Sequence, residues 1–255
     1  MRSITYSLSS RKRRYEVSET KAVAVFASGG GTNLQSLIDT FGADGSPDPS
    51  ARIALVVTDR PGIRALERAE KAGAPTATIP PKEYESTDAF AAALLEVLSE
   101  HRIDLIALAG YLKLIPAKVV EAYRGRIVNI HPAPLPAFGG PGMYGHHVHE
   151  AVLECNAAVS GPTIHFVDER YDTGPIIGQW PVPVQPDDTP DTLAARVLRY
   201  EHKLYPAVLR ALARGEVELL PDGKVRRGVF AAGEQGFQLG DEEAALGSVQ
   251  PAWKA

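Results

Sequence analysis

Short apolar segments alternate with amphipathic segments through the first half of the chain. The apolar run at residues 22–27 predicts a buried strand, and this strand ends at a glycine-rich turn. Beyond that turn, apolar residues recur at every third or fourth position as far as Phe41, which is the spacing of one helix face. Thr32 and Asn33 are good N-cap residues, so we expect this helix to begin near them.

The alternation of strands and helices continues to residue 131. Further strands are predicted at residues 53–58, 76–79, 104–109 and 126–131, and further helices at residues 64–72, at residues 86–102 and after Pro116, which we place at the first helical position. Strands that alternate with helices form βαβ units. The predicted fold class is therefore α/β, with an open, mostly parallel, doubly wound sheet of about seven strands.

The pattern changes after residue 132, where a loop rich in proline and glycine is predicted at residues 133–145. It is followed by a predicted helix at 147–155, strands at 163–168 and 176–184, a long helix at 189–214 and a small C-terminal hairpin at 216–227. We predict one domain at residues 22–230. Residues 1–21 and 231–255 are expected to be tails.

Composition restricts the classes of protein that fit this pattern. With 255 residues, of which 44% are apolar and 23% charged, the chain is typical of a globular protein. Its net charge of −4 argues against a globally nucleic-acid-binding surface, although not against a local basic patch, and no apolar stretch is long enough for a membrane span. The single cysteine, Cys155, favours a cytoplasmic location and is expected to be a packing residue. The basic run at residues 11–14 lacks the apolar segment of a secretory signal, so we interpret it as part of a solvated tail.

The turn Ser28-Gly29-Gly30-Gly31-Thr32-Asn33 joins the first predicted strand to the first predicted helix. Backbone N–H groups can converge in such a turn, and the helix N-terminus adds partial positive charge, so the turn suits a phosphate. Its spacing matches neither a dinucleotide-binding fingerprint nor a Walker motif. A phosphate-binding loop and a plain tight turn both fit the sequence.

Candidate catalytic groups follow at the end of the strand at 126–131. Asn129 and His131 are two residues apart, so their side chains share one face, at the end of the strand where open α/β sheets bind ligands. An amide beside an imidazole suits acyl transfer, because one holds the developing oxyanion and the other moves a proton. A structural histidine is the alternative. Asp168, Glu169 and Asp172 cluster in one later turn, either as partners of the imidazole or as a solvated acidic turn.

Three histidines, His146, His147 and His149, raise the question of a metal site. Their spacing does not match a helical pair of ligands, and no thiolate is near them in the sequence. We therefore predict no metal and expect these residues to border a loop.

Several segments resemble the phosphoribosylglycinamide formyltransferases, folate-dependent enzymes of purine synthesis. The resemblance covers residues 22–215 and is carried by residues 26–35 and 108–115, by Asn129-Ile130-His131-Pro132 with Leu135-Pro136, and by residues 165–175 and 201–206. An Asn-x-His-Pro motif followed by Asp-x-Gly-Pro is specific for the folate formyltransferase superfamily. The glycine loop and Glu201-His202 favour the glycinamide enzyme.

The resemblance implies transfer of a formyl group from 10-formyltetrahydrofolate to the amine of glycinamide ribonucleotide, with small molecules as its partners and no metal, nucleic acid or membrane. It implies a catalytic trio of Asn129, His131 and Asp172, with His131 cationic. Residues 22–128 would bind the ribonucleotide phosphate, and residues 129–214 would carry catalysis and bind the folate. The implied binding residues are Gly30, Gly31, Thr32, Asn33 and Glu201 for the ribonucleotide, and Leu112, Lys113, Leu114, Ile115, Asp168 and Glu169 for the folate.

Two departures from the family pattern and several alternatives stay open. Thr87 stands where many relatives have an arginine that contacts folate, and the loop at residues 138–149 is longer than in the shortest relatives. A formyltetrahydrofolate hydrolase or another folate formyltransferase is one alternative, although we expect too few residues before Ala22 and after Arg214 for the extra domains that these usually carry. A non-catalytic nucleotide-binding module is the alternative from a different class. Both a monomer and a homodimer are open.

Overall fold

Seven strands form the central sheet of the protein. The computed structural model describes residues 20–227, so the basic run at 11–14 and almost all of the two predicted tails lie outside the described residues. The strand order is β3-β2-β1-β4-β5-β7-β8. The bounds are β1 Lys21–Ala27, β2 Ala51–Thr58, β3 Thr76–Thr78, β4 Leu105–Leu108, β5 Ile127–His131, β7 Thr163–Phe166 and β8 Ile176–Gln179.

The strands from β1 to β5 pair in parallel, whereas β7 is antiparallel to both β5 and β8. The predicted open and mostly parallel sheet is therefore confirmed. After β1, the chain builds outward through β2 and β3 before it returns to the other side of β1 with β4. This reversal between β1 and β4 leaves a crevice at the carboxyl ends of the strands, where the loops that follow them diverge.

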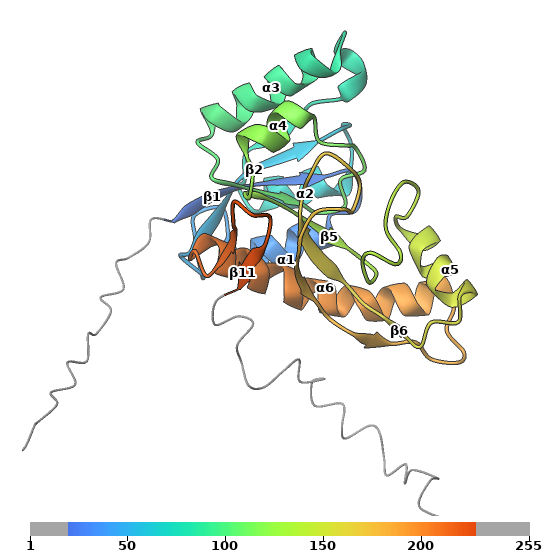
Figure 1. Cartoon of the computed structure of the whole chain (residues 1–255). Coiled ribbons are helices and arrows are strands. Elements are labelled where there is room, and N and C mark those ends of the chain that lie inside the picture. Colours follow the sequence, from blue (N-terminus) through green and yellow to red (C-terminus); the bar gives the residue numbers. More distant parts are fainter. Residues whose placement is uncertain (1–19, 228–255) are drawn as a thin grey trace, which may run out of the picture.

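Helices cover both faces of the sheet, as the alternating pattern predicts (Figure 1). On one face lie α1 (Thr32–Phe41) and α6 (Pro190–Ala213), with α2 (Arg64–Lys71) beside α1; on the other lie α3 (Thr87–Glu100) and α4 (Ala117–Ala122). Side chains of β1 alternate between the two cores, with Val23 and Val25 in the first and Ala24 and Phe26 in the second. The central strand is thereby buried on both sides.

Some boundaries differ from the prediction for physical reasons. Pro116 is the N-cap of α4 rather than its first helical residue, because its ψ of 140° is extended. The strand predicted at 176–184 divides into β8 and β9 (Val182–Pro183), since Pro181 has no N–H for a continuous ladder. Strand β9 pairs instead with β6 (Val159–Ser160), which the sequence pattern did not indicate. The short helix η1 (Pro81–Glu83) was also not predicted.

The segment after the sheet carries the remaining elements. Helix α5 (His146–Glu154) begins one residue before the predicted start and packs against α6. Thr189 and Thr192 form a reciprocal capping box at the start of α6. Further along α6, the buried Tyr205 hydroxyl lies 2.9 Å from the carbonyl oxygen of Leu108 and 3.2 Å from that of Val128, and so fixes the helix to β4 and β5. The predicted hairpin is present as β10 (Val217–Leu219) and β11 (Val225–Arg227). In residues 20–227, no helix combines the length and the apolar character that a membrane crossing needs.

Candidate active site

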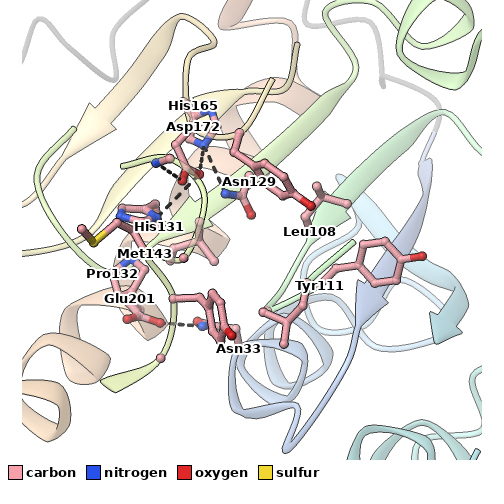
Figure 2. A pocket seen from close by; sticks show the side chains of 18 of the residues that line it. Asn33, Leu108, Tyr111, Asn129, His131, Pro132, Met143, His165, Asp172 and Glu201 are labelled. Carbon is pink, nitrogen blue, oxygen red and sulfur yellow. Dashed lines mark hydrogen bonds and ion pairs between the residues drawn. The ribbon is translucent and has the colours of Figure 1, made fainter. Parts of the chain in front are cut away.

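A cavity of about 800 Å³ lies at the crevice between β1 and β4. Its walls come from the segments that follow β1, β4 and β5, from the loop before α5, from the turn before β8 and from α6. Figure 2 shows two polar groups in it: Asn129, His131, His165 and Asp172 on one side, and Asn33 with Glu201 on the other. The loops thus join residues that are distant in the sequence around one space.

The glycine turn forms one end of this cavity, through Gly30, Thr32 and Asn33. The N-cap of α1 is Gly31, with a φ of 69°, and not Thr32 or Asn33 as expected; no side chain within residues 20–227 caps the helix. A Cβ atom at Gly31 would lie 2.9 Å from Cα and Cβ of Ala65, so glycine is needed both for the left-handed backbone and for the close approach of α2. Because no side chain of the described part of the chain accepts from the first-turn N–H groups, these groups are available to an anion.

Asn129 is held by His165 from the neighbouring strand. The two residues are direct cross-strand partners in the antiparallel β5–β7 pair, and Asn129 Nδ2 lies 3.1 Å from His165 Nε2. His165 Nδ1 lies 2.7 Å from the Phe166 carbonyl, which only accepts, so Nδ1 carries the ring proton of a neutral His165 and Nε2 accepts from Asn129. This network orients the amide with its NH₂ toward His165 and leaves the second N–H of that group free to donate.

His131 and Asp172 lie beside this amide. His131 Nδ1 is 3.6 Å from Asp172 Oδ1, and His165 Nε2 lies at the same distance from that oxygen (Figure 2). Both separations are longer than a direct hydrogen bond. His131 Nε2 donates to the carbonyl oxygen of Phe138 at 2.6 Å, so that nitrogen carries the proton of the neutral ring.

Burial has opposite consequences for the imidazole and the carboxylate. Burial lowers the pKa of His131 below its usual range, and the raising effects of Asp172 and of the Phe138 carbonyl do not outweigh it. Burial acts to raise the pKa of Asp172, but His165, His131 and the Gly140 N–H together hold it below the usual value. The resting site therefore contains a neutral imidazole beside an ionised carboxylate at neutral pH. The cationic His131 expected from the resemblance does not match this resting state.

The turn that carries Asp172 depends on special backbone positions. Asp172 has a φ of 57°, a left-handed conformation that Asp and Asn tolerate better than most residues. Its Oδ2 accepts a hydrogen bond of 2.9 Å from the Gly140 N–H. A Cβ atom at Gly174 would lie 1.8 Å from the Phe166 carbonyl oxygen, so only glycine fits there. Glycine in the Asp-x-Gly-Pro motif is thus explained by the close packing of the turn on β7.

Glu201 and Asn33 form the opposite polar group. The buried Glu201 accepts a 2.6 Å hydrogen bond from Asn33 Nδ2. Burial raises the pKa of Glu201, and the Asn33 hydrogen bond opposes that effect only in part. Asn33 Oδ1 is buried and has no hydrogen-bond partner among residues 20–227. A ligand that donates hydrogen bonds, such as a sugar hydroxyl, would satisfy these acceptors.

Exposed apolar side chains border the cavity on the side of β4 and of the Asp172 turn. Leu112 and Leu114 are 42% and 43% exposed and Tyr171 is 40% exposed, and all three line the cavity, as do Lys113 and Ile115. Large exposed apolar side chains around a cavity indicate a ligand with an apolar surface. Two predicted folate residues do not line it: Asp168 accepts from Thr173 Oγ1 within its own turn, and Glu169 is exposed outside the cavity. Val167, Arg170 and Tyr171 occupy that wall instead.

A sequence profile of the formyl transferase family matches residues 21–209. The chain belongs to the formyl transferase family. The resemblance inferred from the motifs is thereby confirmed.

Named relatives of this formyltransferase include enzymes from a plant and from a bacterium. The chain is 46% identical over 204 residues to a chloroplastic phosphoribosylglycinamide formyltransferase of Arabidopsis thaliana. The aligned region covers 80% of this chain and 69% of the relative. It is 42% identical over 192 residues to the phosphoribosylglycinamide formyltransferase of Bacillus subtilis, across 75% of this chain and 94% of the relative. The crystal structure of glycinamide ribonucleotide transformylase 1 from Symbiobacterium toebii superimposes with a TM-score of 0.76 at 38% identity, covering 86% of this chain and all of that chain.

The formyltransferase brings the predicted trio together, but sequence reasoning missed His165. Asn129, His131 and Asp172 all line one cavity, with Glu201 and three of the four predicted loop residues; Gly31 faces α2 instead. His165 could have been identified only from the antiparallel pairing of β5 with β7, because a single sequence does not give strand register.

The remaining candidates of the formyltransferase lie at its surface or at the cavity edge. His146 and His149 line the cavity, whereas His147 contacts Glu150 at the surface. Within the described range, no group of three or more His, Cys, Asp or Glu side chains is arranged to hold a metal ion. Cys155 is exposed, so its predicted role as a packing residue is wrong. Thr87 is exposed at the start of α3 and does not line the cavity.

Proposed function

We propose that this formyltransferase transfers the formyl group of 10-formyltetrahydrofolate to the amine of phosphoribosylglycinamide, a step of purine biosynthesis, with Asn129, His131 and Asp172 as the reacting groups. The observation that carries this proposal is the meeting of an amide, an imidazole and an ionised carboxylate in the same 800 Å³ cavity as the glycine loop. The names of the relatives support the choice of substrates.

The ribonucleotide would occupy the part of the cavity between the glycine loop and α6. Its phosphate would bind the free N–H groups at the start of α1, because a helix N-terminus combines donors with partial positive charge. Its ribose hydroxyls would donate to Glu201 and to the unpartnered Asn33 Oδ1. The amine at the other end of the substrate would then lie toward the amide and the imidazole.

The folate would occupy the apolar side of the cavity, near Leu112, Leu114 and Tyr171. Lys113 and Ile115 border the same wall. A heteroaromatic ring buries apolar area there while the loop backbone supplies hydrogen-bonding groups. Asp168 and Glu169 would contribute to this wall by shaping the turn rather than by contact, since neither faces the cavity.

Formyl transfer requires that one C–N bond form and another break. The substrate amine attacks the formyl carbon, and the formyl oxygen becomes an oxyanion that the second N–H of Asn129 stabilises. The neutral His131 accepts the proton that the attacking nitrogen loses, directly or through one water, and the Asp172 carboxylate stabilises the imidazolium formed. His131 then returns the proton to the leaving folate nitrogen, and the carbonyl re-forms. His165 positions Asn129 throughout.

Deformylation of a formyl-folate analogue, followed spectrophotometrically, tests the proposal. We expect turnover that depends on phosphoribosylglycinamide and needs no added metal. Release of formate at the same rate without the acceptor would identify a hydrolase instead. Binding of a nucleotide monophosphate without any folate binding would identify a non-catalytic binding module.

We also propose small molecules as the partners of this chain and the cytoplasm as its location. The net charge of −4 supports the first point, because nucleic-acid-binding surfaces are basic. The single cysteine supports the second. A homodimer stays an open prediction, which sedimentation analysis would test.

A further inference from the structure

The glycine loop is held from behind by helix α2. The N–H of Ala65 donates to the carbonyl oxygen of Gly29 at 3.2 Å, and Arg68 Nε donates to that of Gly30 at 2.9 Å. The carbonyl oxygen of Gly31 accepts from the N–H of Gln35 at 2.9 Å, the first hydrogen bond of α1. Three successive carbonyl groups of the loop therefore have defined partners.

These hydrogen bonds determine where the loop N–H groups point. In a trans peptide, the C=O and the following N–H are directed to opposite sides of the peptide plane. When Arg68 fixes the Gly30 carbonyl, it therefore directs the Gly31 N–H away from α2. The N–H groups of Gly30 and Gly31 donate no hydrogen bond within the part of the chain that the structure describes. Both are thus oriented and available.

Arg68 holds the Gly30 carbonyl from outside the substrate cavity. It lines a separate polar hollow of about 430 Å³ on the outer side of α1, with residues such as Gln35, Asp39 and His202, and it does not line the main cavity. A guanidinium nitrogen, Nη1, donates to Gln35 Oε1 at 2.9 Å, and Gln35 Nε2 donates to Asp39 Oδ1 at 2.8 Å. This chain of hydrogen bonds along α1 fixes the guanidinium relative to the loop.

The charge of Arg68 is also not neutralised by a direct partner. No carboxylate lies within ion-pair distance of it among residues 20–227. Gly30, Thr32, Asn33 and Glu201 line the cavity, and its lining also includes two side chains that are always cationic at neutral pH, Lys113 from the segment after β4 and Arg170 from the Asp172 turn; neither belongs to the glycine loop or to α6. A phosphate bound there would find its positive charge in the helix terminus and in Arg68 behind the loop.

We propose that Arg68 is a positioning residue for substrate binding: it orients the Gly30–Gly31 peptide toward the phosphate and places a positive charge behind the loop without touching the substrate. This inference rests on the proposed function, since it assumes that the loop binds the ribonucleotide phosphate. It predicts a role in binding the phosphate-bearing substrate and none in the formyl transfer step.

Steady-state kinetics of Arg68→Ala test this role. We expect the KM for phosphoribosylglycinamide to rise by about 10- to 30-fold, because a charge-assisted hydrogen bond and a nearby charge are lost together. We expect kcat and the KM for the formyl-folate analogue to change less than about threefold. Arg68→Gln keeps a hydrogen-bond donor but not the charge. Its KM for phosphoribosylglycinamide should lie between those of the parent protein and of Arg68→Ala. Lys71→Ala is the matched control, because Lys71 is an exposed cation on the same helix, and it should behave as the parent protein.

Inhibition by ribose 5-phosphate separates this role from a general loss of structure. The inhibition constant should rise by the same factor as the KM in Arg68→Ala, while melting temperature and folate affinity are kept. An unchanged KM and inhibition constant in an active Arg68→Ala protein would overturn the inference. A fall in kcat by the same factor as the rise in KM would also overturn it. If Arg68→Ala does not fold, Arg68→Gln decides by the same two constants. If the parent protein shows no acceptor-dependent turnover, the proposed function fails, yet calorimetric binding of ribose 5-phosphate to the parent and variant proteins still tests Arg68.

Discussion

Replacing Asp172 by asparagine removes the negative charge from the polar cluster and leaves its shape almost unchanged. The left-handed backbone at this position suits Asn as well as Asp, so the turn should persist. The Asn oxygen can still accept from the Gly140 N–H. The variant therefore isolates the electrostatic role of the carboxylate from its structural role.

The magnitude follows from the distance between the ring and the carboxylate. Asp172 Oδ1 lies 3.6 Å from His131 Nδ1. At an effective dielectric constant of about 20, Coulomb's law gives roughly 4–5 kcal/mol for an imidazolium and a carboxylate at that distance. Because each 1.4 kcal/mol is tenfold in rate and the Asn dipole retains part of the interaction, we expect kcat to fall by about a thousandfold. The KM for phosphoribosylglycinamide should stay within about threefold.

The pH profile supplies an independent measurement. Asp172 raises the pKa of His131 against the lowering effect of burial, so its removal should lower that pKa further. The acidic limb of kcat should accordingly move to lower pH in Asp172→Asn. Asp187→Asn, a charge removal at an exposed position outside the cavity, serves as the control and should leave both kcat and the profile unchanged. A fall in kcat of less than tenfold with an unshifted acidic limb would refute the assigned role of Asp172.

Three further predictions concern stability. Gly174→Ala would place a Cβ atom 1.8 Å from the Phe166 carbonyl oxygen, so we expect a loss of about 3 kcal/mol or more by urea unfolding, together with reduced kcat because Asp172 lies in the same turn. Burial lowers the pKa of His149 to about 4, so the unfolded state takes up a proton first as the pH falls below 6.5. Between pH 7 and pH 5, the free energy of unfolding of the parent protein should therefore fall by about 2 kcal/mol through this group. The free energy of unfolding of His149→Gln should fall correspondingly less over the same range. Burial acts to raise the pKa of Asp48, but hydrogen bonds from Arg210 and Ser50 outweigh it and lower that pKa to about 2. Asp48→Asn should therefore reduce the free energy of unfolding by about 1–2 kcal/mol at pH 7, and this difference should disappear as the pH falls from about 4 to 2.

Local patterns were sufficient for most of the fold. The apolar run of β1, the glycines after it and the helical spacing of α1 lie close together in the sequence, and the alternation of such units indicates a parallel sheet. Local sequence patterns do not predict features that depend on contacts between distant parts of the chain. Strand β6 is two residues long and exists because it pairs with β9, and the close contact of Gly161 with the Trp180 carbonyl is set by tertiary packing.

The residues of the candidate site also divide into those that local sequence patterns predict and those that depend on distant contacts. Asn129 and His131 share a face of one strand, and the motif around Asp172 carried the resemblance, so the trio was predictable. His165 was missed because its role depends on being opposite Asn129 across β5 and β7. The position of Asp168 and Glu169 in the motif predicts contact with the folate, whereas the turn directs Asp168 back onto Thr173. The charge of His131 could not be read from residue type, because burial decides it.

Acceptor-dependent deformylation by the parent protein and by Asn129→Ala is the most direct test of the central claim, that the amide–imidazole–carboxylate cluster performs formyl transfer. In the proposed mechanism, the N–H of Asn129 that does not face His165 donates to the oxyanion. Loss of one such donor typically costs about a hundred- to a thousandfold in kcat. We expect the parent protein to turn over the formyl-folate analogue rapidly with phosphoribosylglycinamide and only slowly without it, and we expect a loss of that size in the variant. Equal rates with and without the acceptor, or full activity of Asn129→Ala, would contradict the central claim.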